Sequence, residues 1–202
     1  MTVQGVDVSG YQGTVNWADL KNKDGIELGI CKATQSINFM DGSFTFNWKM
    51  IKQEGLTARV AYHFIVPSTD AGMYAQASYF KRIVGPLGPG DTWMVDIEPK
   101  AQGAPLPTAD DLKAFVQTVL AQVSKPGILY GNLDDLKATN AVPLARDMGC
   151  IINLANYGVN DGNDHGVPSD AVAYCGIHSE STNTHQRERL LALMVTTTEI
   201  CG

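Results

Sequence analysis

The chain has 202 residues, of which 44% are hydrophobic and 18% are charged, so it is long enough for one globular domain with a sizeable core. Its formal net charge of −6 is spread along the sequence, and Lys and Arg do not cluster. These values exclude wholesale disorder and argue against nucleic acid or an anionic membrane as the main partner, because such contacts need grouped cations.

Strand-like and helix-like segments alternate along most of the chain. Short apolar runs predict strands, and apolar residues at helical spacing between capping residues and glycines predict helices. The predicted strands are 3–8, 26–32, 59–66, 93–98, 127–131, 150–155, 171–177 and 193–198. Helices are predicted at 16–24, between Ser43 and Gly55, near 71–83, after Thr108 and at 133–145, with a short helical stretch around 187–191.

The regular alternation predicts the fold class. The helix after Thr108 has the clearest amphipathic face, formed by Leu112, Phe115, Val116, Val119 and Val123. Apolar strands with helices between them imply a parallel sheet that helices cover on its outer face. Eight strands and five well-formed helices favour a single-domain α/β protein with a TIM-like closed barrel, spanning 1–202 and irregular in its last part. An open doubly wound sheet is the alternative.

Polar side chains gather where the predicted strands end. In a barrel of parallel strands, chemistry belongs at this carboxyl end. The residues concerned are Asp7, Lys32, Tyr62, His63, Asp96, Glu98, Tyr130, Asn156 and Tyr157. Because neighbours in a strand face opposite ways, Tyr62 and His63 cannot both face the site, and His63 is interpreted as structural.

Asp96 and Glu98 end the apolar run 93–99 and are two residues apart. Alternate side chains of a strand share a face, so the two carboxylates would point the same way. Like charges at this spacing push their pKa values apart, which lets one group hold a proton while the other is ionised. Glycosidases divide their chemistry between two carboxyl groups in this manner. An exposed Asp-x-Glu without chemical role is the alternative.

Neither a metal site nor thiol catalysis is expected. Cys31, Cys150, Cys175 and Cys201 are isolated, and no histidine lies at metal-ligand spacing. We therefore expect reduced thiols and no cofactor. The remaining histidines, His165, His178 and His185, have no identifiable partner and are interpreted as loop residues.

Five short segments, taken in chain order, resemble the glycoside hydrolase family 25 muramidases, which are lysozymes. They are 5–13 (GVDVSGYQG), 31–34 (CKAT), 61–64 (AYHF), 95–98 (VDIE) and 154–157 (LANY). The resemblance implies a (β/α)5(β)3 barrel. It also implies that Glu98 is the general acid, that Asp96 orients and stabilises the reacting N-acetyl group, and that Asp7 hydrogen-bonds within the site. The substrate contacts expected in this barrel are Lys32, Tyr62, Tyr130, Asn156 and Tyr157.

The chain departs from the family pattern in two places. Gln35-Ser36 stands where the family usually has Glu-Gly, so an amide replaces a carboxylate at the rim of the cleft. Residues 158–202 follow the pattern poorly, and 173–180 (AYCGIHSE) replaces the expected aromatic strand and its cleft acid. Glu180 is a candidate to supply the missing acid.

The resemblance predicts an N-acetylmuramidase that hydrolyses the β-1,4 bond between N-acetylmuramic acid and N-acetylglucosamine in bacterial peptidoglycan, without cofactor or metal. The N-terminal residues lack the basic and apolar regions of a secretory signal. This favours a phage endolysin held in the host cytoplasm until lysis, or a wall-degrading part of a phage particle. The alternatives are a glycan-binding or structural module without turnover, and a barrel enzyme that uses Lys32 as a Schiff-base amine. The oligomeric state stays open.

Overall fold

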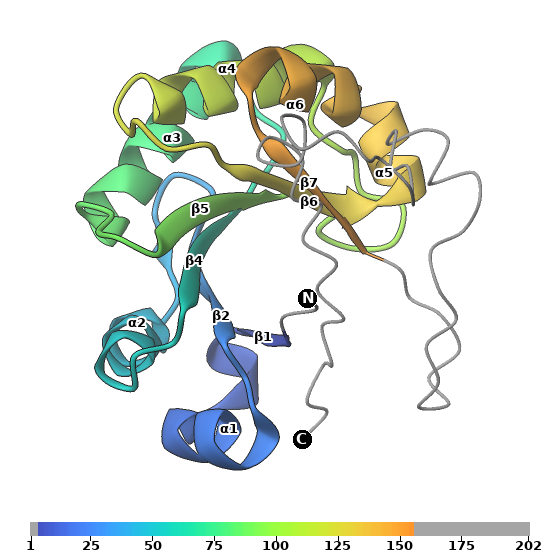
Figure 1. Cartoon of the computed structure of the whole chain (residues 1–202). Helices are drawn as coiled ribbons and strands as arrows, with labels where there is room; N and C mark the ends of the chain where they lie inside the picture. The colour runs from blue at the N-terminus through green and yellow to red at the C-terminus, as the bar shows by residue number, and fades with distance from the viewer. Residues whose placement is uncertain (1–3, 156–202) are drawn as a thin grey trace, which may run out of the picture.

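A computed structural model of the protein describes residues 4–155 and shows one curled parallel sheet (Figure 1). The strands pair in the order β1-β2-β4-β5-β6-β7, and a short strand β3 pairs antiparallel with β2. Their bounds are β1 Gly5–Val8, β2 Leu28–Gln35, β3 Phe39–Met40, β4 Ala58–Phe64, β5 Asp91–Asp96, β6 Ile128–Asn132 and β7 Ile151–Ala155. Every strand predicted before residue 156 is confirmed, whereas β3 was not predicted.

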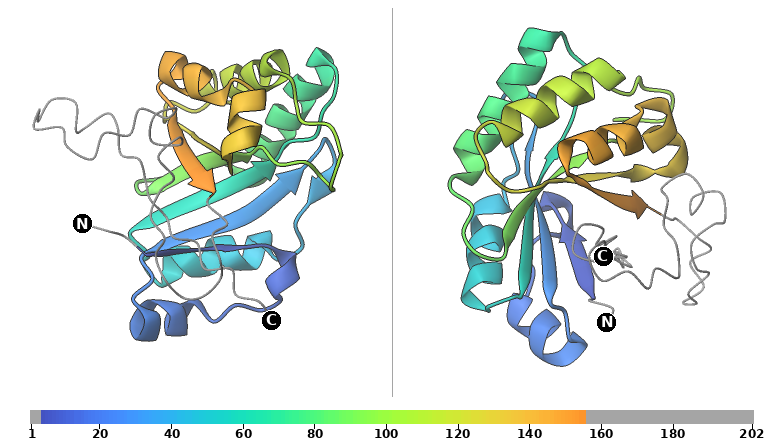
Figure 2. Two further views of the ribbon diagram at one scale, coloured as in Figure 1. Left: turned by 90° about the vertical axis from the view of Figure 1, so that its right-hand side faces the viewer. Right: turned by 45° about the horizontal axis from the view of Figure 1, so that its top comes forward.

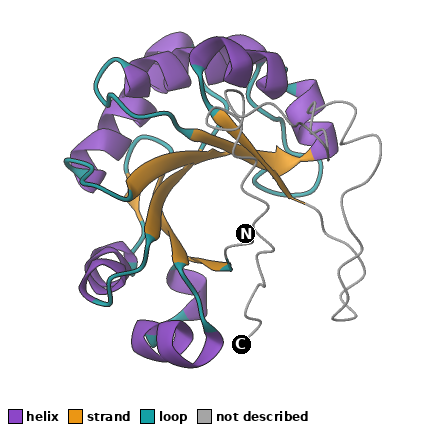
Figure 3. Cartoon of the chain, in the orientation of Figure 1, coloured by secondary structure: helices purple, strands orange, loops and turns teal. Residues whose placement is uncertain are grey.

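Helices cover the convex face of the sheet, and the strands curl around the other face (Figures 2 and 3). Their bounds are η1 Gly10–Gln12, α1 Trp17–Asp24, α2 Phe44–Gln53, α3 Asp70–Val84, α4 Ala109–Leu120, α5 Leu133–Ala138 and α6 Ala141–Met148. The described part is therefore an α/β half-barrel of parallel strands. The predicted strands 171–177 and 193–198 and the helical stretch 187–191 lie outside the described residues.

The single helix predicted at 133–145 is wrong, because two helices, α5 and α6, occupy this stretch. Thr139 ends α5, where its hydroxyl donates to the Asp135 carbonyl at 2.8 Å. Asn140 then takes the left-handed conformation, with φ 53°, which breaks the helical path. Pro143 lies in the first turn of α6, where its missing N–H is not needed. Hydrophobic spacing alone does not reveal such a break.

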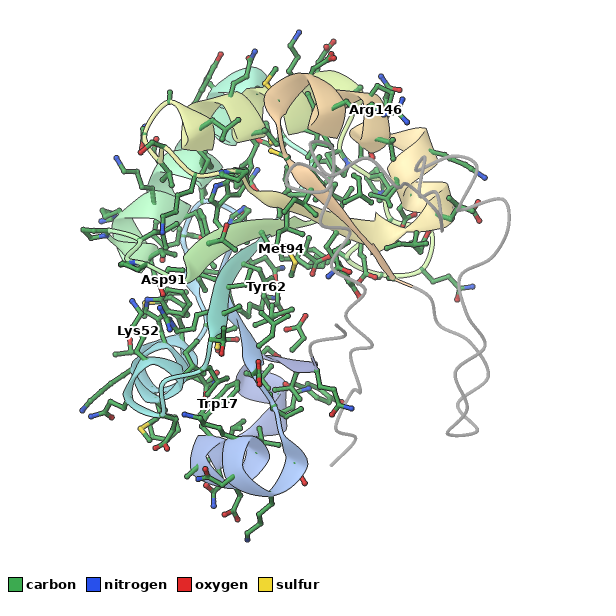
Figure 4. The ribbon with its side chains drawn as sticks, viewed as in Figure 1. Trp17, Lys52, Tyr62, Asp91, Met94 and Arg146 are labelled. Atoms are coloured by element: carbon green, nitrogen blue, oxygen red, sulfur yellow. The ribbon has the colours of Figure 1, made fainter. Side chains whose placement is uncertain are left out.

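The core has two layers, one on each face of the sheet. The larger layer lies between the sheet and the helices, and it includes Trp48 of α2 and the predicted α4 face at Leu112, Phe115, Val116 and Val119. Val123 lies beyond the end of α4 and is only partly buried. The smaller layer lines the concave face and consists of Leu28, Ile30, Val60, Tyr62, Met94, Ile128 and Tyr130. In Figure 4, Tyr62 and Met94 lie on the concave side, opposite the helices.

An ion cluster around buried Asp91 lies at the amino end of the sheet. Asp91, the first residue of β5, accepts from Arg59 Nε at 2.6 Å and lies 2.9 Å from Lys52 Nζ. Burial by itself would raise the pKa of Asp91, but the hydrogen bonds from Arg59 and Lys52 outweigh it and lower the pKa. Polar networks at this end of a barrel serve stability rather than chemistry.

His63 is structural, as predicted, and it lies in the helix-side layer stacked on Phe115 at 4.9 Å between ring centres. Gln76 exchanges hydrogen bonds with the main chain of Val66, which fixes its amide so that Oε1 faces His63 Nε2 at 3.1 Å. His63 Nε2 must therefore donate, and Nδ1 accepts from the Thr34 hydroxyl at 2.7 Å. A neutral imidazole satisfies both bonds.

We predict that protonation of His63 destabilises the fold at acid pH. Burial first, with a contribution from the Lys32 charge, lowers its pKa from 6.5 to about 4, although the Gln76 hydrogen bond opposes the change. Between these pH values the unfolded chain binds more protons, so the free energy of unfolding falls as the pH falls. At 1.36 kcal/mol per pKa unit, the loss is about 3 kcal/mol. Urea unfolding of the parent and of His63→Gln at pH 7 and pH 4 measures it.

The variant supplies the control, because other groups titrate in both proteins. The change in unfolding free energy between the two pH values should be smaller in His63→Gln by about the same 3 kcal/mol. An equal change in both proteins would show that folding does not lower the pKa of His63.

Candidate active site

The strand register gathers the predicted site residues on the concave side, at the carboxyl end of the sheet. In the sheet, Lys32 pairs with Tyr62, which pairs with Met94. Two residues further along β4 and β5, Phe64 pairs with Asp96, and Asp96 also pairs with Tyr130 of β6. Parallel neighbours in register face the same way, so these side chains share the concave face.

Asp96 and Glu98 lie at and just beyond the end of β5. Val95 and Ile97 are buried in the helix-side layer, so Asp96, which lies between them, faces the concave side. The Ile97 N–H donates to the Tyr130 carbonyl at 2.8 Å, which continues the strand pairing past the last residue of β5. By the same alternation Glu98 follows on the side of Asp96. It is half-buried, whereas Asp96 is 7% exposed.

Asp96 is a carboxyl group under electrostatic strain. Burial raises its pKa most, and the charges of Glu98 and Asp7 raise it further, while the nearby Lys32 ammonium lowers it. The net result is a pKa well above the ordinary range. One oxygen, Asp96 Oδ1, is buried and makes no hydrogen bond within residues 4–155. Asp96 therefore holds a proton more readily than an ordinary aspartate.

Asp7, on β1, the first strand in the pairing order of residues 4–155, contributes to the same site from the other side. Its Cα pairs with Ile30 of the concave layer, so its side chain faces the concave side and is half-buried there. The Asp7 charge raises the pKa of both Asp96 and Tyr62. Three elements of the fold thus bring Asp7, Tyr62 and Asp96 within electrostatic range.

A bulge in β2 places two polar side chains at the cleft rim. The register shifts between Lys32 and Thr34, so that both Ala33 and Thr34 face the helices and Gln35 returns to the concave side beside Phe64. Lys32 Nζ donates to Gln35 Oε1 at 2.9 Å and lies 4.8 Å from the Phe64 ring centre. Strict alternation along β2 would have put Lys32 and Gln35 on opposite faces.

Lys32 is the cation that acts on Asp96 from β2. Burial lowers the pKa of its half-buried amine, while the charges of Asp96, Asp41 and Asp7 oppose that shift. No ion pair within 4.0 Å joins Lys32 to another described residue, so its charge acts on the cleft at longer range. The three carboxylates oppose the effect of burial but do not outweigh it, so the net shift of the Lys32 pKa is downward.

The two predicted tyrosines line the wall of the site. Tyr62 and Tyr130 are 8% and 9% exposed and belong to the concave layer. Burial, followed by the charges of Asp7, Asp96 and Asp41, raises the pKa of Tyr62 well above its usual value. Tyr62 therefore stays a protonated hydrogen-bond donor that faces carboxylates.

Sequence reasoning missed some residues of this face and placed others beyond the described part. Phe64 and buried Asn153 face the concave side, and both are signalled by alternation, Phe64 with Tyr62 in β4 and Asn153 through its pairing with Tyr130. Outside the described residues lie Asn156, Tyr157, His165, Cys175, His178, Glu180, His185 and Cys201. Cys31 and Cys150 are free thiols, one buried and one half-buried.

Residues 4–155 offer neither a metal site nor a membrane-spanning helix. No group of three or more His, Cys, Asp or Glu side chains in this part has the arrangement needed to hold a metal ion. The helices described here are all too short or too polar to cross a membrane.

The comparison with known families decides the affiliation, because the pattern of the glycosyl hydrolases family 25 matches residues 6–175. The chain belongs to glycosyl hydrolases family 25. Its half-barrel resembles the family 25 lysozyme of Aspergillus fumigatus with a TM-score of 0.66 and 28% identity, covering 84% of this chain and 83% of that one. The muramidase of Acremonium alcalophilum gives a TM-score of 0.67 and 26% identity, with 83% and 82% covered.

Among curated relatives, this family 25 chain is 41% identical over 78 residues to Lysozyme M1 of Streptomyces globisporus, which covers 39% of this chain. The matches span between 26% and 48% of the length of the curated relatives. The chain therefore matches less than half of the length of each of these relatives.

We predict that Asp96→Asn stabilises the fold at neutral pH. The pKa of Asp96 is raised by burial and by Glu98, so its favourable contribution is present below about pH 3.9, the unfolded value, and is lost as the pH rises through the folded value. An amide removes the buried charge, and Tm at pH 7 should rise by about 2–4 °C, or roughly 1 kcal/mol. Calorimetry of Asp96→Asn, with the exposed Asp110→Asn as control, measures it. A variant that melts no higher than the parent at pH 7 would contradict the strain assigned to Asp96.

Proposed function

We propose that this family 25 chain is a lysozyme of the N-acetylmuramidase type, which hydrolyses the β-1,4 bond between N-acetylmuramic acid and N-acetylglucosamine in peptidoglycan. The observation that carries the proposal is the electrostatic coupling of Asp96 and Glu98 at the carboxyl end of β5. Two interacting carboxyl groups that face one side are what acid catalysis on a glycosidic oxygen requires. Family membership and the muramidases among its structural neighbours support the same substrate class.

In the proposed mechanism, Glu98 protonates the leaving glycosidic oxygen while the N-acetyl carbonyl of the substrate attacks the anomeric carbon. Asp96 accepts the amide N–H, orients the group and balances the positive charge of the oxazolinium ring. Water then attacks the anomeric carbon from the face that the leaving group left, and this opens the oxazolinium ring. The Glu98 carboxylate takes the proton of that water, and the anomeric configuration is retained. Tyr62 and Lys32 lie beside the pair and contribute hydrogen bonding and positive charge.

The proton must lie on Glu98 when the bond breaks, although Asp96 is the carboxyl whose pKa is raised in the free protein. A bound N-acetyl amide would donate to Asp96, whose buried Oδ1 makes no hydrogen bond to residues 4–155, and this favours the ionised form. Binding would therefore shift the shared proton from Asp96 toward Glu98.

The remaining predictions belong to the same proposal. We propose that residues beyond 155 complete a single-domain (β/α)5(β)3 barrel and bring Asn156 and Tyr157 to the cleft. We propose a phage lysis context, as an endolysin released from the host cytoplasm or as part of the phage particle. An endolysin of known structure, CTP1L, is among the structural neighbours, with a TM-score of 0.64 and 26% identity over 79% of this chain.

The test of this function is the loss of wall lysis in Glu98→Gln and Asp96→Asn. A general acid supplies about 10²–10⁴ in rate, and Gln keeps the size of Glu but has no proton to transfer, so lysis should fall at least a hundredfold. Asp96→Asn should also be severe, because an amide leaves the oxazolinium charge unbalanced. Clearing of purified peptidoglycan suspensions measures both.

The matched control is Glu27→Gln, an exposed residue just before β2 at the opposite end of the sheet. It should clear the suspension like the parent. If both site variants keep activity within threefold of the parent, the carboxylate-pair mechanism is wrong. If the parent binds peptidoglycan without clearing it, a glycan-binding module on the same barrel is the better description.

A further inference from the structure

A depression of about 380 Å³ lies beside the candidate active site, between the turn after β1 and the start of α2. Its walls come from two segments that are far apart in the sequence. The lining residues are Gly10, Gly13, Thr14, Gly42, Ser43 and Phe46. The first segment follows the carboxyl end of β1, and the second follows β3, which pairs with the last residues of β2 at the end of the sheet that carries Asp96.

The buried carboxylate of Asp41 holds the two walls together. Asp41 Oδ2 accepts from the Gly10 N–H at 2.9 Å, and Oδ1 accepts from the Ser43 N–H at 2.9 Å and from its hydroxyl at 2.6 Å. The turn after β1 is further fixed by a capping box between Ser9 and Gln12. The depression therefore has walls that are set before any ligand binds, which lowers the entropic cost of binding.

Asp41 also shows that the depression and the cleft are close together. Its charge raises the pKa of Tyr62 and opposes the lowering of the Lys32 pKa, and both residues belong to the concave side. Its main-chain N–H donates to the Ala33 carbonyl at the β2 bulge, at 2.9 Å. A chain bound across the strand ends would meet the depression next to the cleft.

The lining has the chemistry of a neutral sugar site. Phe46 offers an aromatic ring that is 44% exposed, Thr14 and Ser43 carry hydroxyls, and the glycines leave main-chain groups accessible. Tyr11, in the same turn as Gly10 and Gly13, is 95% exposed. None of the lining residues is charged. Aromatic rings pack against the C–H face of a pyranose, while hydroxyl and main-chain groups bond its oxygens.

We propose that this depression is an accessory carbohydrate subsite that binds an N-acetylhexosamine residue of the glycan strand beyond the scissile bond. Its aromatic contacts are Phe46 in the lining and Tyr11 in the adjoining turn, outside the lining. The proposal deepens the lysozyme function and rests on it. A stem peptide fits less well, because its carboxylate and ammonium groups would find no charged partner in the lining.

The test compares binding of long and short glycans to full-length variants that also carry Glu98→Gln, which prevents cleavage. The probes are peptide-free strands of alternating N-acetylglucosamine and N-acetylmuramic acid, at least eight sugars long, and the corresponding tetrasaccharide. Phe46→Ala and Tyr11→Ala should each raise Kd for the long strand roughly three- to tenfold. Both should leave Kd for the tetrasaccharide within twofold, because the cleft alone accommodates that shorter ligand.

Two further variants test whether the effect is specific to the depression. Tyr74→Ala removes another exposed aromatic side chain, 54% exposed on α3, and should change neither Kd. Gly42→Leu adds bulk where an added Cβ would meet nothing within 4 Å, so it should fold normally, fill the depression and weaken binding of the long strand. In the active background, Phe46→Ala should raise KM for long strands with kcat unchanged.

The outcomes separate this proposal from the general function. If the parent clears peptidoglycan while Phe46→Ala, Tyr11→Ala and Gly42→Leu all bind long strands like Tyr74→Ala, the subsite is wrong and the lysozyme function stands. If the Glu98→Gln protein binds neither glycan and the parent does not clear peptidoglycan, both proposals are wrong. If the parent fails to cleave but the three variants lose long-strand binding, the subsite stands without the lysozyme function.

Discussion

Repulsion among the carboxylates Asp7, Asp96 and Glu98 is the physical constraint on which the carboxyl end of this sheet depends. Burial of Asp96 and the two neighbouring negative charges favour its protonated form, and the Lys32 ammonium offsets only part of that effect. The same repulsion costs stability, because Asp96 is buried beside two negative charges. It is also the property on which the proposed acid catalysis depends.

The opposite end of the same strand shows how differently the fold treats an aspartate. Asp91 begins β5 with direct hydrogen bonds from Arg59 and Lys52, and its pKa is lowered despite burial. Asp96 ends β5 without such a contact on Oδ1 from the described residues, and its pKa is raised. Stabilising charge pairs thus lie at the amino end of the half-barrel and strained charge lies at the carboxyl end, as expected for a barrel that places chemistry at the carboxyl end.

Hydrogen bonds in the helix-side layer help to position the side chains at the cleft rim. The Thr34 hydroxyl bonds to the neutral His63 ring, which Gln76 holds from the other side. Thr34 can make this bond only because the β2 bulge turns it toward the helices, and the same bulge brings Gln35 to Lys32 on the concave face. A buried polar network on one side of the sheet therefore supports the arrangement of a charged group on the other.

The sequence by itself determined the features that depend on local pattern. The alternation of strands and helices, the buried face of α4 and the opposite orientations of Tyr62 and His63 follow from periods of 3.6 and 2 residues, and the structure confirms them. Only the tertiary structure decided the β2 bulge, strand β3 and the break between α5 and α6. The same holds for the hydrogen bond from the Gly10 N–H to Asp41, which joins residues 31 positions apart. Each of these is set by hydrogen bonds between distant segments or by a single left-handed residue, and such contacts form only when the chain is folded, so no local periodicity records them.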